Sequence, residues 1–316
     1  MEAPIAYIVI PCYNEEEVLY ETVQRLTRKL DHMAAKKQIH EKSRIMLVND
    51  GSKDKTWQMI EELYEKNSYV TGVNLSRNKG HQNALLAGLL TAKEYGDIVI
   101  SMDADLQDDI EALDRFVEEY QKGSQIVYGV RASREKDTFF KKYTALGFYK
   151  VMQLMGVELV YNHADYRLLS KRAIEELAEF KEVNLFLRGL IPMLGFQTSV
   201  VEYERNERFA GESKYPLKKM IAFAIDGVTS CSIKPIRLIT LSGVVISIFS
   251  LFFLVYVILG QFAGTTVRGW ATSIVLICFF GGFQIFCIGI VGEYVGKIYN
   301  ETKQRPRYII ADKRIK

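Results

Sequence analysis

The segment Ile98-Val-Ile-Ser-Met-Asp-Ala-Asp-Leu-Gln107 joins a short apolar run directly to a D-x-D pair. The run from Ile98 to Met102 has the length and the residue types of a buried strand. Asp103 and Asp105 follow at the point where this strand ends. Two carboxylates and the amide of Gln107 offer the oxygen ligands that a hard divalent cation prefers. The segment therefore predicts a buried strand with a candidate metal site at its carboxyl end.

Similar apolar runs occur on both sides of this segment, within residues 1–210. They are Ala6–Ile10, Ile45–Asn49, Val70–Leu75 and Ile126–Gly129. Helical patterns separate them; in one, apolar residues from Leu19 to Met33 recur every three or four positions, and Asn14 with Glu17 predicts a capping box at its start. This alternation predicts a doubly wound α/β sheet, whose ligands bind beyond the carboxyl ends of the strands.

Polar residues also follow the first two predicted strands. Pro11-Cys-Tyr-Asn-Glu15 follows the first, and Asn49-Asp-Gly-Ser52 follows the second. The chain has neither G-x-G-x-x-G nor a P-loop, so neither motif explains a nucleotide-type sheet. A lone D-x-D is typical of a solvated turn. Asp50 follows a second strand, so the acidic residues together favour a functional site over a chance arrangement. A cation held there can neutralise a diphosphate leaving group.

Composition excludes several classes of protein. The 316 residues carry 41 basic and 38 acidic side chains, a net charge of +3 that is too balanced for a protein that coats nucleic acid. Cys12, Cys231, Cys278 and Cys287 lie too far apart for a zinc or dithiol motif, which indicates a reducing compartment. Residues 1–11 do not resemble a secretory signal, so the N-terminal part is expected in the cytosol.

Two charge-free runs predict a pair of membrane-spanning helices within residues 237–296. Leu238–Gly260 and Trp270–Gly292 are each about 23 residues long, enough for roughly 35 Å of helix. The alternative is a pair of buried helices in a soluble core. The link between the runs carries only Arg268, whereas basic residues precede the first run and fill the tail, 297–316. The positive-inside rule therefore predicts a multi-pass protein of the cell membrane with both termini cytoplasmic.

Two further stretches, 138–156 and the juxtamembrane stretch 211–236, combine apolar residues at helical spacing with lysines. They predict interfacial helices in the headgroup layer, with ordinary core-facing helices as the alternative.

Several motifs together resemble the donor site of family 2 glycosyltransferases with the GT-A fold. They are Pro11-x-Tyr-Asn-Glu15, Val48-Asn-Asp-Gly-Ser52, Ser76-Arg-Asn-Lys-Gly-His81 and Asp103-Ala-Asp-Leu-Gln107. Asp165-Tyr-Arg-Leu168, Arg208-Phe-Ala-Gly-Glu-Ser-Lys-Tyr215 and the paired C-terminal helices resemble the subgroup that glycosylates polyprenyl phosphates, which includes bactoprenol glucosyltransferases and dolichol-phosphate mannose synthases. This resemblance covers essentially the whole chain.

The resemblance implies a role for each matching residue. The implied catalytic residues are Asp165 and Asp105, and the implied ligands of Mg²⁺ or Mn²⁺, held against the diphosphate, are Asp103, Asp105 and Gln107. The nucleoside would be contacted by Pro11, Tyr13, Glu15 and Asp50, and the diphosphate would be covered by Arg208 and Lys214. The lipid phosphate would be bound by Arg131, with Arg134 or Lys141.

The role of Asp165 has two interpretations. It corresponds to the family's proposed catalytic base. However, a phosphate monoester has a second pKa of about 6, so the acceptor oxygen is already largely ionised at cytosolic pH. The reaction then needs cations that position the acceptor more than it needs a base. We therefore expect Asp165 to orient the acceptor or an arginine, with base catalysis as the alternative.

The resulting hypothesis is an inverting, metal-dependent transferase that moves glucose or N-acetylglucosamine from a UDP-sugar to undecaprenyl phosphate at the cytoplasmic membrane face. Its product would be a lipid-linked sugar donor for cell-envelope glycosylation. The resemblance also implies a homotetramer. The alternatives are a GDP-mannose-dependent mannose synthase and a non-catalytic membrane adaptor, which the intact acidic cluster disfavours. A processive polysaccharide synthase is disfavoured because the chain lacks Q-x-x-R-W and further membrane helices.

Overall fold

The computed structural model describes residues 2–132, 154–155, 163–204, 227–230, 232–262 and 269–316. Both predicted interfacial stretches fall largely outside these ranges. Four predicted site residues, Arg134, Lys141, Arg208 and Lys214, also lie outside the described residues.

The described part of the N-terminal region is built on one eight-stranded sheet with the order β7-β5-β6-β4-β1-β2-β3-β8. The strands are β1 (Ala6–Cys12), β2 (Arg44–Asn49), β3 (Val70–Leu75), β4 (Ile98–Ser101), β5 (Ile126–Arg131), β6 (His163–Ser170), β7 (Thr198–Tyr203) and β8 (Ile310–Arg314). The strands β4, β1, β2 and β3 are parallel, and their apolar residues are buried on both faces of the sheet.

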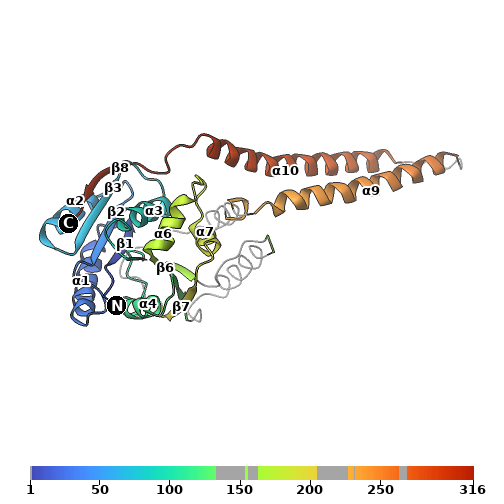
Figure 1. Cartoon of the computed structure of the whole chain (residues 1–316). Helices are drawn as coiled ribbons and strands as arrows, with labels where there is room; N and C mark the ends of the chain where they lie inside the picture. The colour runs from blue at the N-terminus through green and yellow to red at the C-terminus, as the bar shows by residue number, and fades with distance from the viewer. Residues whose placement is uncertain (1, 133–153, 156–162, 205–226, 231, 263–268) are drawn as a thin grey trace.

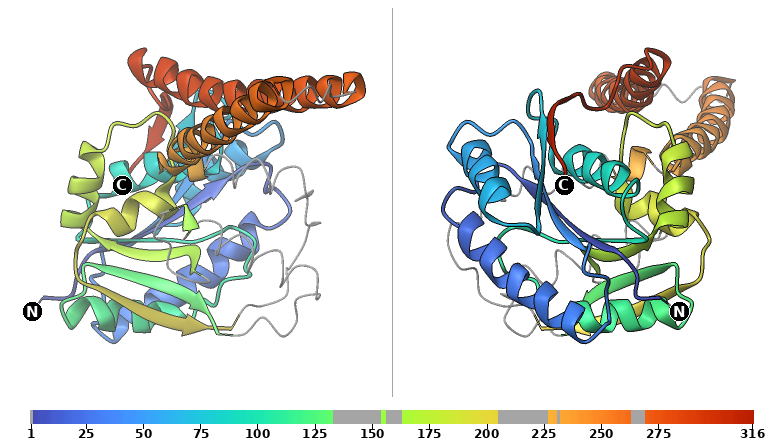
Figure 2. Two further views of the ribbon diagram at one scale, coloured as in Figure 1. Left: turned by 90° about the vertical axis from the view of Figure 1, so that its right-hand side faces the viewer. Right: turned by 60° about the vertical axis from the view of Figure 1, so that its left-hand side comes forward.

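Helices cover both faces of the sheet (Figures 1 and 2). One face packs against α1 (Leu19–Ala35), α2 (Thr56–Lys66) and α4 (Ala112–Gln121), and the other against α3 (His81–Ala92), α6 (Lys171–Glu179) and α7 (Leu187–Met193). Alternate residues of β1 serve the two layers: Ile8 and Ile10 pack in the first, Tyr7 and Val9 in the second. The predicted doubly wound α/β fold is confirmed.

Strand β6 runs against its neighbours and was not predicted. It pairs antiparallel with both β4 and β5, and Arg167 lies opposite Ser101. Because β6 is antiparallel, it begins at the edge where β4 ends. Its first residues, including Asp165, therefore lie beside the D-x-D loop that follows β4.

The predicted capping box is wrong. The helix α1 begins at Leu19, and its N-cap residue Val18 makes no side-chain cap. Asn14 instead adopts a left-handed backbone conformation with φ of 55°, and its Oδ1 accepts a hydrogen bond from the amide of Lys53 at 2.9 Å. Its side chain joins the β1 loop to the β2 loop rather than starting a helix.

A helical hairpin extends from this domain (Figure 1). It consists of α9 (Lys234–Phe262) and α10 (Trp270–Thr302), and each contains a stretch long and apolar enough to cross a membrane. Both helices continue beyond the predicted apolar runs toward the domain. After α10 the chain returns to the sheet, where β8 pairs antiparallel with β3. The segment predicted as a basic tail thus contains an edge strand.

Candidate active site

The loops after β1 and β2 are fastened together at the carboxyl edge of the sheet. The amide of Asn14 donates to Ser52 Oγ at 3.0 Å, and the amide of Glu15 donates to Thr56 Oγ1 at 3.0 Å. Pro11 is buried within β1, whereas the Tyr13 side chain is exposed. Of the residues predicted to contact a nucleoside, Tyr13 therefore presents the most accessible surface.

Asp50 occupies an enclosed position, with 2% of its surface exposed. Its two carboxylate oxygens accept hydrogen bonds from the amides of Lys79, at 2.7 Å, and Gly80, at 2.9 Å. Burial raises the pKa of Asp50, although these two amides act in the opposite direction. The structure thus places Asp50 as a support for the turn before α3.

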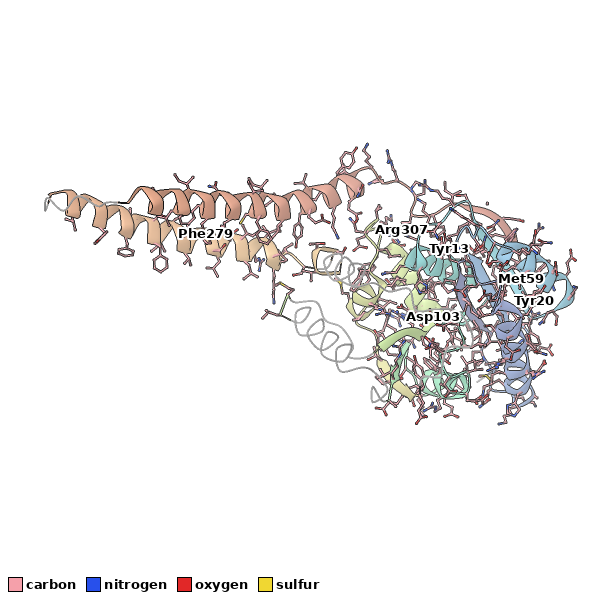
Figure 3. The ribbon with its side chains drawn as sticks, turned by 180° about the vertical axis from the view of Figure 1, so that it is seen from behind. Tyr13, Tyr20, Met59, Asp103, Phe279 and Arg307 are labelled. Atoms are coloured by element: carbon pink, nitrogen blue, oxygen red, sulfur yellow. The ribbon has the colours of Figure 1, made fainter. Side chains whose placement is uncertain are left out.

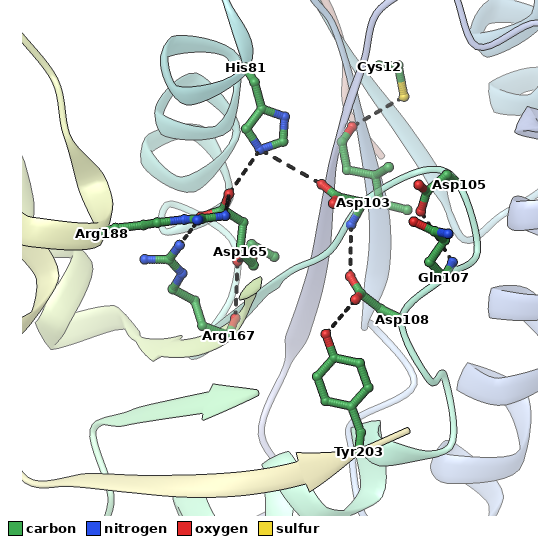
Figure 4. Close-up of polar contacts among 12 residues, drawn as sticks. Cys12, His81, Asp103, Asp105, Gln107, Asp108, Asp165, Arg167, Arg188 and Tyr203 are labelled. Atoms are coloured by element: carbon green, nitrogen blue, oxygen red, sulfur yellow. Dashed lines mark hydrogen bonds and ion pairs between the residues drawn. The ribbon is translucent and has the colours of Figure 1, made fainter. Parts of the chain in front are cut away.

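The D-x-D loop follows β4 (Figure 4). Leu106 has a φ of 57°, and the amide of Gln107 donates to Asp105 Oδ1 at 3.2 Å, so the loop folds back at this point. The Asp103 side chain is 44% exposed. Loss of hydration raises the pKa of Asp103, and the nearby carboxylates of Asp165 and Asp105 raise it further. This concentration of negative charge suits a cationic ligand.

A buried carboxyl group supports the D-x-D loop from below. Asp108 is 3% exposed; its Oδ1 accepts the Tyr203 hydroxyl at 2.6 Å and its Oδ2 accepts the Asp103 amide at 3.5 Å. Burial, followed by the charge of Asp103, raises the pKa of Asp108 to about 7. Arg131, at the end of β5, lies close enough to oppose that rise and to interact with Tyr203.

Asp165 lies between two arginines at the start of β6. Arg188 of α7 donates from Nη2 to Asp165 Oδ2 at 2.8 Å and from Nε to Oδ1 at 3.2 Å, and Arg167 pairs with Oδ1. Burial alone would raise the pKa of Asp165. The two guanidinium groups outweigh burial and hold this pKa well below its ordinary value. Asp165 is therefore a carboxylate at neutral pH.

His81, the first residue of α3, lies between Asp165 and the D-x-D loop (Figure 4). Its Nε2 lies 3.8 Å from Asp103 Oδ1 and 3.8 Å from Asp165 Oδ2. The imidazole therefore stands between the two carboxylates that the sequence assigned to metal binding and to catalysis.

The structure places Asp103 near both Asp105 and Asp165, and the Gln107 amide bonds to Asp105; it also adds residues that sequence reasoning did not assign. His81 belonged to a quoted motif, so a signal for it existed. Arg188 and Asp108 carry no motif and become visible only through their contacts. Within the described ranges, no group of three or more His, Cys, Asp and Glu side chains is arranged to hold a metal ion.

Comparison with known proteins identifies the family. The model of glycosyl transferase family 2 matches residues 7–178, which include all of β1 to β6 except Ala6, the D-x-D loop and Asp165. The chain belongs to glycosyl transferase family 2. Its mixed α/β sheet is the GT-A fold of these enzymes, as predicted.

Relatives match this family 2 glycosyltransferase along nearly its whole length. The uncharacterized glycosyltransferase YkoT of Bacillus subtilis is 52% identical over 307 residues, 97% of this chain and 91% of the relative. The bactoprenol glucosyl transferase of Shigella phage SfX is 37% identical over 312 residues, 97% of this chain and 99% of the relative.

A solved structure of low sequence identity also resembles the chain. Glucosyl-3-phosphoglycerate synthase from Mycobacterium tuberculosis, crystallised with Mn²⁺, UDP and phosphoglyceric acid, is 16% identical with a TM-score of 0.46, over 72% of this chain and 76% of that chain.

Proposed function

We propose that this family 2 glycosyltransferase moves a hexose, glucose or N-acetylglucosamine, from a UDP-sugar to undecaprenyl phosphate at the cytoplasmic face of the cell membrane. One observation carries the proposal: the D-x-D loop and the Asp165 carboxylate with its two arginines lie at one sheet edge, joined by His81 at 3.8 Å from each. The name of the phage relative, a bactoprenol glucosyl transferase, supports a polyprenyl phosphate as the acceptor.

The residue types of the D-x-D loop support a divalent cation as its ligand. Asp103 and Asp105 supply hard oxygen ligands, and their mutual repulsion contributes to the raised pKa of Asp103. With Gln107 they would hold Mg²⁺ or Mn²⁺, which would neutralise charge on the departing nucleoside diphosphate. Asp108 and Tyr203 fix the backbone of this loop from below.

Asp165, with Arg167 and Arg188, suits the acceptor side of the reaction. A carboxylate whose pKa is held well below its ordinary value is a weak base, so Asp165 is better suited to orienting Arg188 and Arg167. The acceptor phosphate, already ionised, attacks the anomeric carbon with an oxygen lone pair as the carbon–oxygen bond to UDP breaks. UDP departs with the bonding electrons, and a single displacement inverts the anomeric centre.

The hairpin would anchor the domain at a lipid bilayer. Its large apolar side chains, among them Phe249, Phe252 and Ile285, are exposed, and such a surface is stable in contact with lipid rather than water. Figure 3 shows Phe279 along the hairpin, away from the domain, and Asp103 within the domain. Arg131, Arg134 and Lys141 remain the predicted ligands of the lipid phosphate, and Arg208 and Lys214 of the diphosphate. A homotetramer also remains a prediction.

The direct test is a donor screen with purified protein in nanodiscs and a short polyprenyl phosphate. UDP-glucose or UDP-N-acetylglucosamine should give a sugar-linked polyprenyl phosphate, and a chelator should stop transfer. Asp103→Ala and Asp105→Ala should each lose at least about 100-fold in rate, whereas Glu65→Ala, at an exposed position on α2, should not change it. Transfer from GDP-mannose would favour the mannose-synthase alternative, and no transfer from any donor would refute the proposal.

The role of Asp165 is tested by Asp165→Asn. If Asp165 orients the arginines, the variant should lose roughly tenfold to 100-fold in kcat and keep the shape of the wild-type pH–rate profile. If it acts as the base, the limb of the profile that reports the base should disappear.

A further inference from the structure

The C-terminal end of α10 contacts the segment that carries Arg188. Glu301 Oε2 accepts a hydrogen bond from the amide of Val183 at 2.8 Å. Glu301 Oε1 accepts two more, from the amide and the side-chain Nδ2 of Asn184, each at 2.9 Å. The same segment begins at Phe180, whose carbonyl accepts a hydrogen bond from Arg307 just beyond α10.

The position of Glu301 is unfavourable without these contacts. α10 ends at Thr302, so Glu301 lies in its last turn, where the helix dipole disfavours negative charge. Three N–H donors from the segment compensate that carboxylate. These charge-assisted hydrogen bonds therefore hold the end of the hairpin in a specific position, which an exposed surface ion pair would not do.

The segment leads directly to the active site. The amide of Leu187 donates to Gln82 Oε1 at 2.8 Å, which fixes the segment next to His81 on α3. Leu187 is buried in the core layer, and the following residue, Arg188, makes the two hydrogen bonds to Asp165. Glu301 thus binds Asn184 at one end of the segment, and Arg188, four residues further along the same segment, binds Asp165 at the reacting edge.

We infer that Glu301 is a positioning residue that makes the Arg188–Asp165 pair depend on the seating of the membrane hairpin. Acceptor transfer would then proceed at full rate only when α10 holds Val183 and Asn184 in place. This inference rests on the proposed function, because it concerns the acceptor side of that reaction.

The kinetic test uses Glu301→Ala in nanodiscs, with Glu293→Ala as the matched control. Glu293 lies on the same helix and is exposed. Glu301→Ala should lower kcat by at least about tenfold and leave the donor KM within roughly twofold. Because partial loss of folded protein would also lower the apparent kcat at unchanged KM, kcat is calculated per molecule of folded protein. Glu301→Gln keeps one acceptor oxygen and should recover part of the loss, and Glu293→Ala should match the wild type.

A double-mutant cycle tests the route through Arg188. If Glu301 acts through that residue, Glu301→Ala should change kcat by less than about twofold in an Arg188→Ala background. Independent, multiplying effects would overturn the inference. Should Glu301→Ala fail to fold, Asn184→Ala removes the Nδ2 hydrogen bond to Glu301 without altering α10, and the same comparisons apply with a smaller expected effect.

Hydrogen exchange separates this inference from the proposed function. Amides of Val183, Asn184 and Leu187 should exchange at least about tenfold faster in Glu301→Ala than in the wild type, whether or not the protein transfers sugar. A wild type that transfers no sugar, with this exchange change present, would refute the proposed function and support the coupling. An active wild type whose Glu301→Ala variant keeps both kcat and protection would overturn the inference alone.

Discussion

Two buried aspartates near the active site show how neighbours decide the charge of the same side chain. Asp165 is flanked by Arg167 and Arg188, and its pKa lies well below the ordinary value despite burial. Asp108 accepts hydrogen bonds from Tyr203 and from the Asp103 amide, but the loss of hydration and the charge of Asp103 dominate and raise its pKa to about 7. One group is therefore a fixed anion, and the other titrates near neutral pH.

The raised pKa of Asp108 predicts a pH-dependent stability. Between the unfolded pKa of 3.8 and the folded value of about 7, the folded protein keeps a proton that the unfolded chain has lost. The free energy of unfolding should therefore fall as the pH rises through this window and level off above it. Without divalent cations, the wild type should lose roughly 2 kcal/mol relative to Asp108→Asn between pH 5 and pH 7.

Thermal or denaturant unfolding in detergent at a series of pH values measures this difference. Asp109→Asn, at the neighbouring carboxylate, serves as the control and should keep the pH dependence of the wild type. Parallel curves for the wild type and Asp108→Asn would show that Asp108 does not titrate in this range.

At the scale of elements, sequence patterns predict those strands that consist of buried apolar residues. The runs that became β1 to β5 were found because both faces of a parallel strand are covered. β6 was missed because it carries Asp165 and Arg167 in a central strand, where ion pairing rather than apolarity allows burial. β8, with Asp312, Lys313 and Arg314, has the charged composition of an edge strand and resembled a tail.

The same reasoning explains the candidate site. Asp103 and Asp105 were predicted because they follow an apolar run at a strand end, and Asp165 because its motif resembles one of the family. Arg188 and Asp108 could not be predicted, because their roles arise from tertiary contacts with β6 and β7, respectively, that no spacing along the sequence encodes.

The turn after β2 predicts a requirement for glycine. Gly51 has a φ of +61°, and a Cβ atom there would lie 2.4 Å from the Asn78 amide nitrogen and 2.5 Å from the Arg77 carbonyl carbon. Gly51→Ala should therefore destabilise the fold by about 3 kcal/mol and displace the loop that leads to His81. Gly80→Ala is the matched control: Gly80 also has a positive φ, of +86°, but its Cβ would meet nothing within 4 Å.

Gly80→Ala should cost only the backbone term, about 1 to 2 kcal/mol. Denaturant unfolding of the two variants and the wild type measures the comparison. Equal losses for Gly51→Ala and Gly80→Ala would mean that the close approach of the two loops does not contribute.

At the scale of the whole molecule, the path of the chain links the sheet to the hairpin twice. The chain leaves the domain before α9, returns after α10 and pairs β8 with β3, so that β8 forms the edge of the same sheet. Arg314 reinforces this return through ion pairs with Glu61 of α2 and with Asp312. A chain that closes its own sheet in this way must have both ends of the hairpin on the side of the domain.

This closure predicts that both ends of the hairpin lie on one side of a membrane, and the basic residues at those ends predict that this side is the cytosol. A fluorescent protein fused after Lys316 should fluoresce in bacterial cells, since it folds in the cytosol, and alkaline phosphatase inserted between α9 and α10 should be active, since it needs the periplasm. Truncation after Phe262, which removes α10 and β8, should make a C-terminal phosphatase active because the chain then crosses once. Positive charge agrees with this orientation: Lys234, Arg237 and Lys297 lie near the domain ends of the helices.

An active phosphatase after Lys316 in the full chain would contradict the topology. It would require β8 to leave β3, because one sheet cannot have strands on both sides of a bilayer.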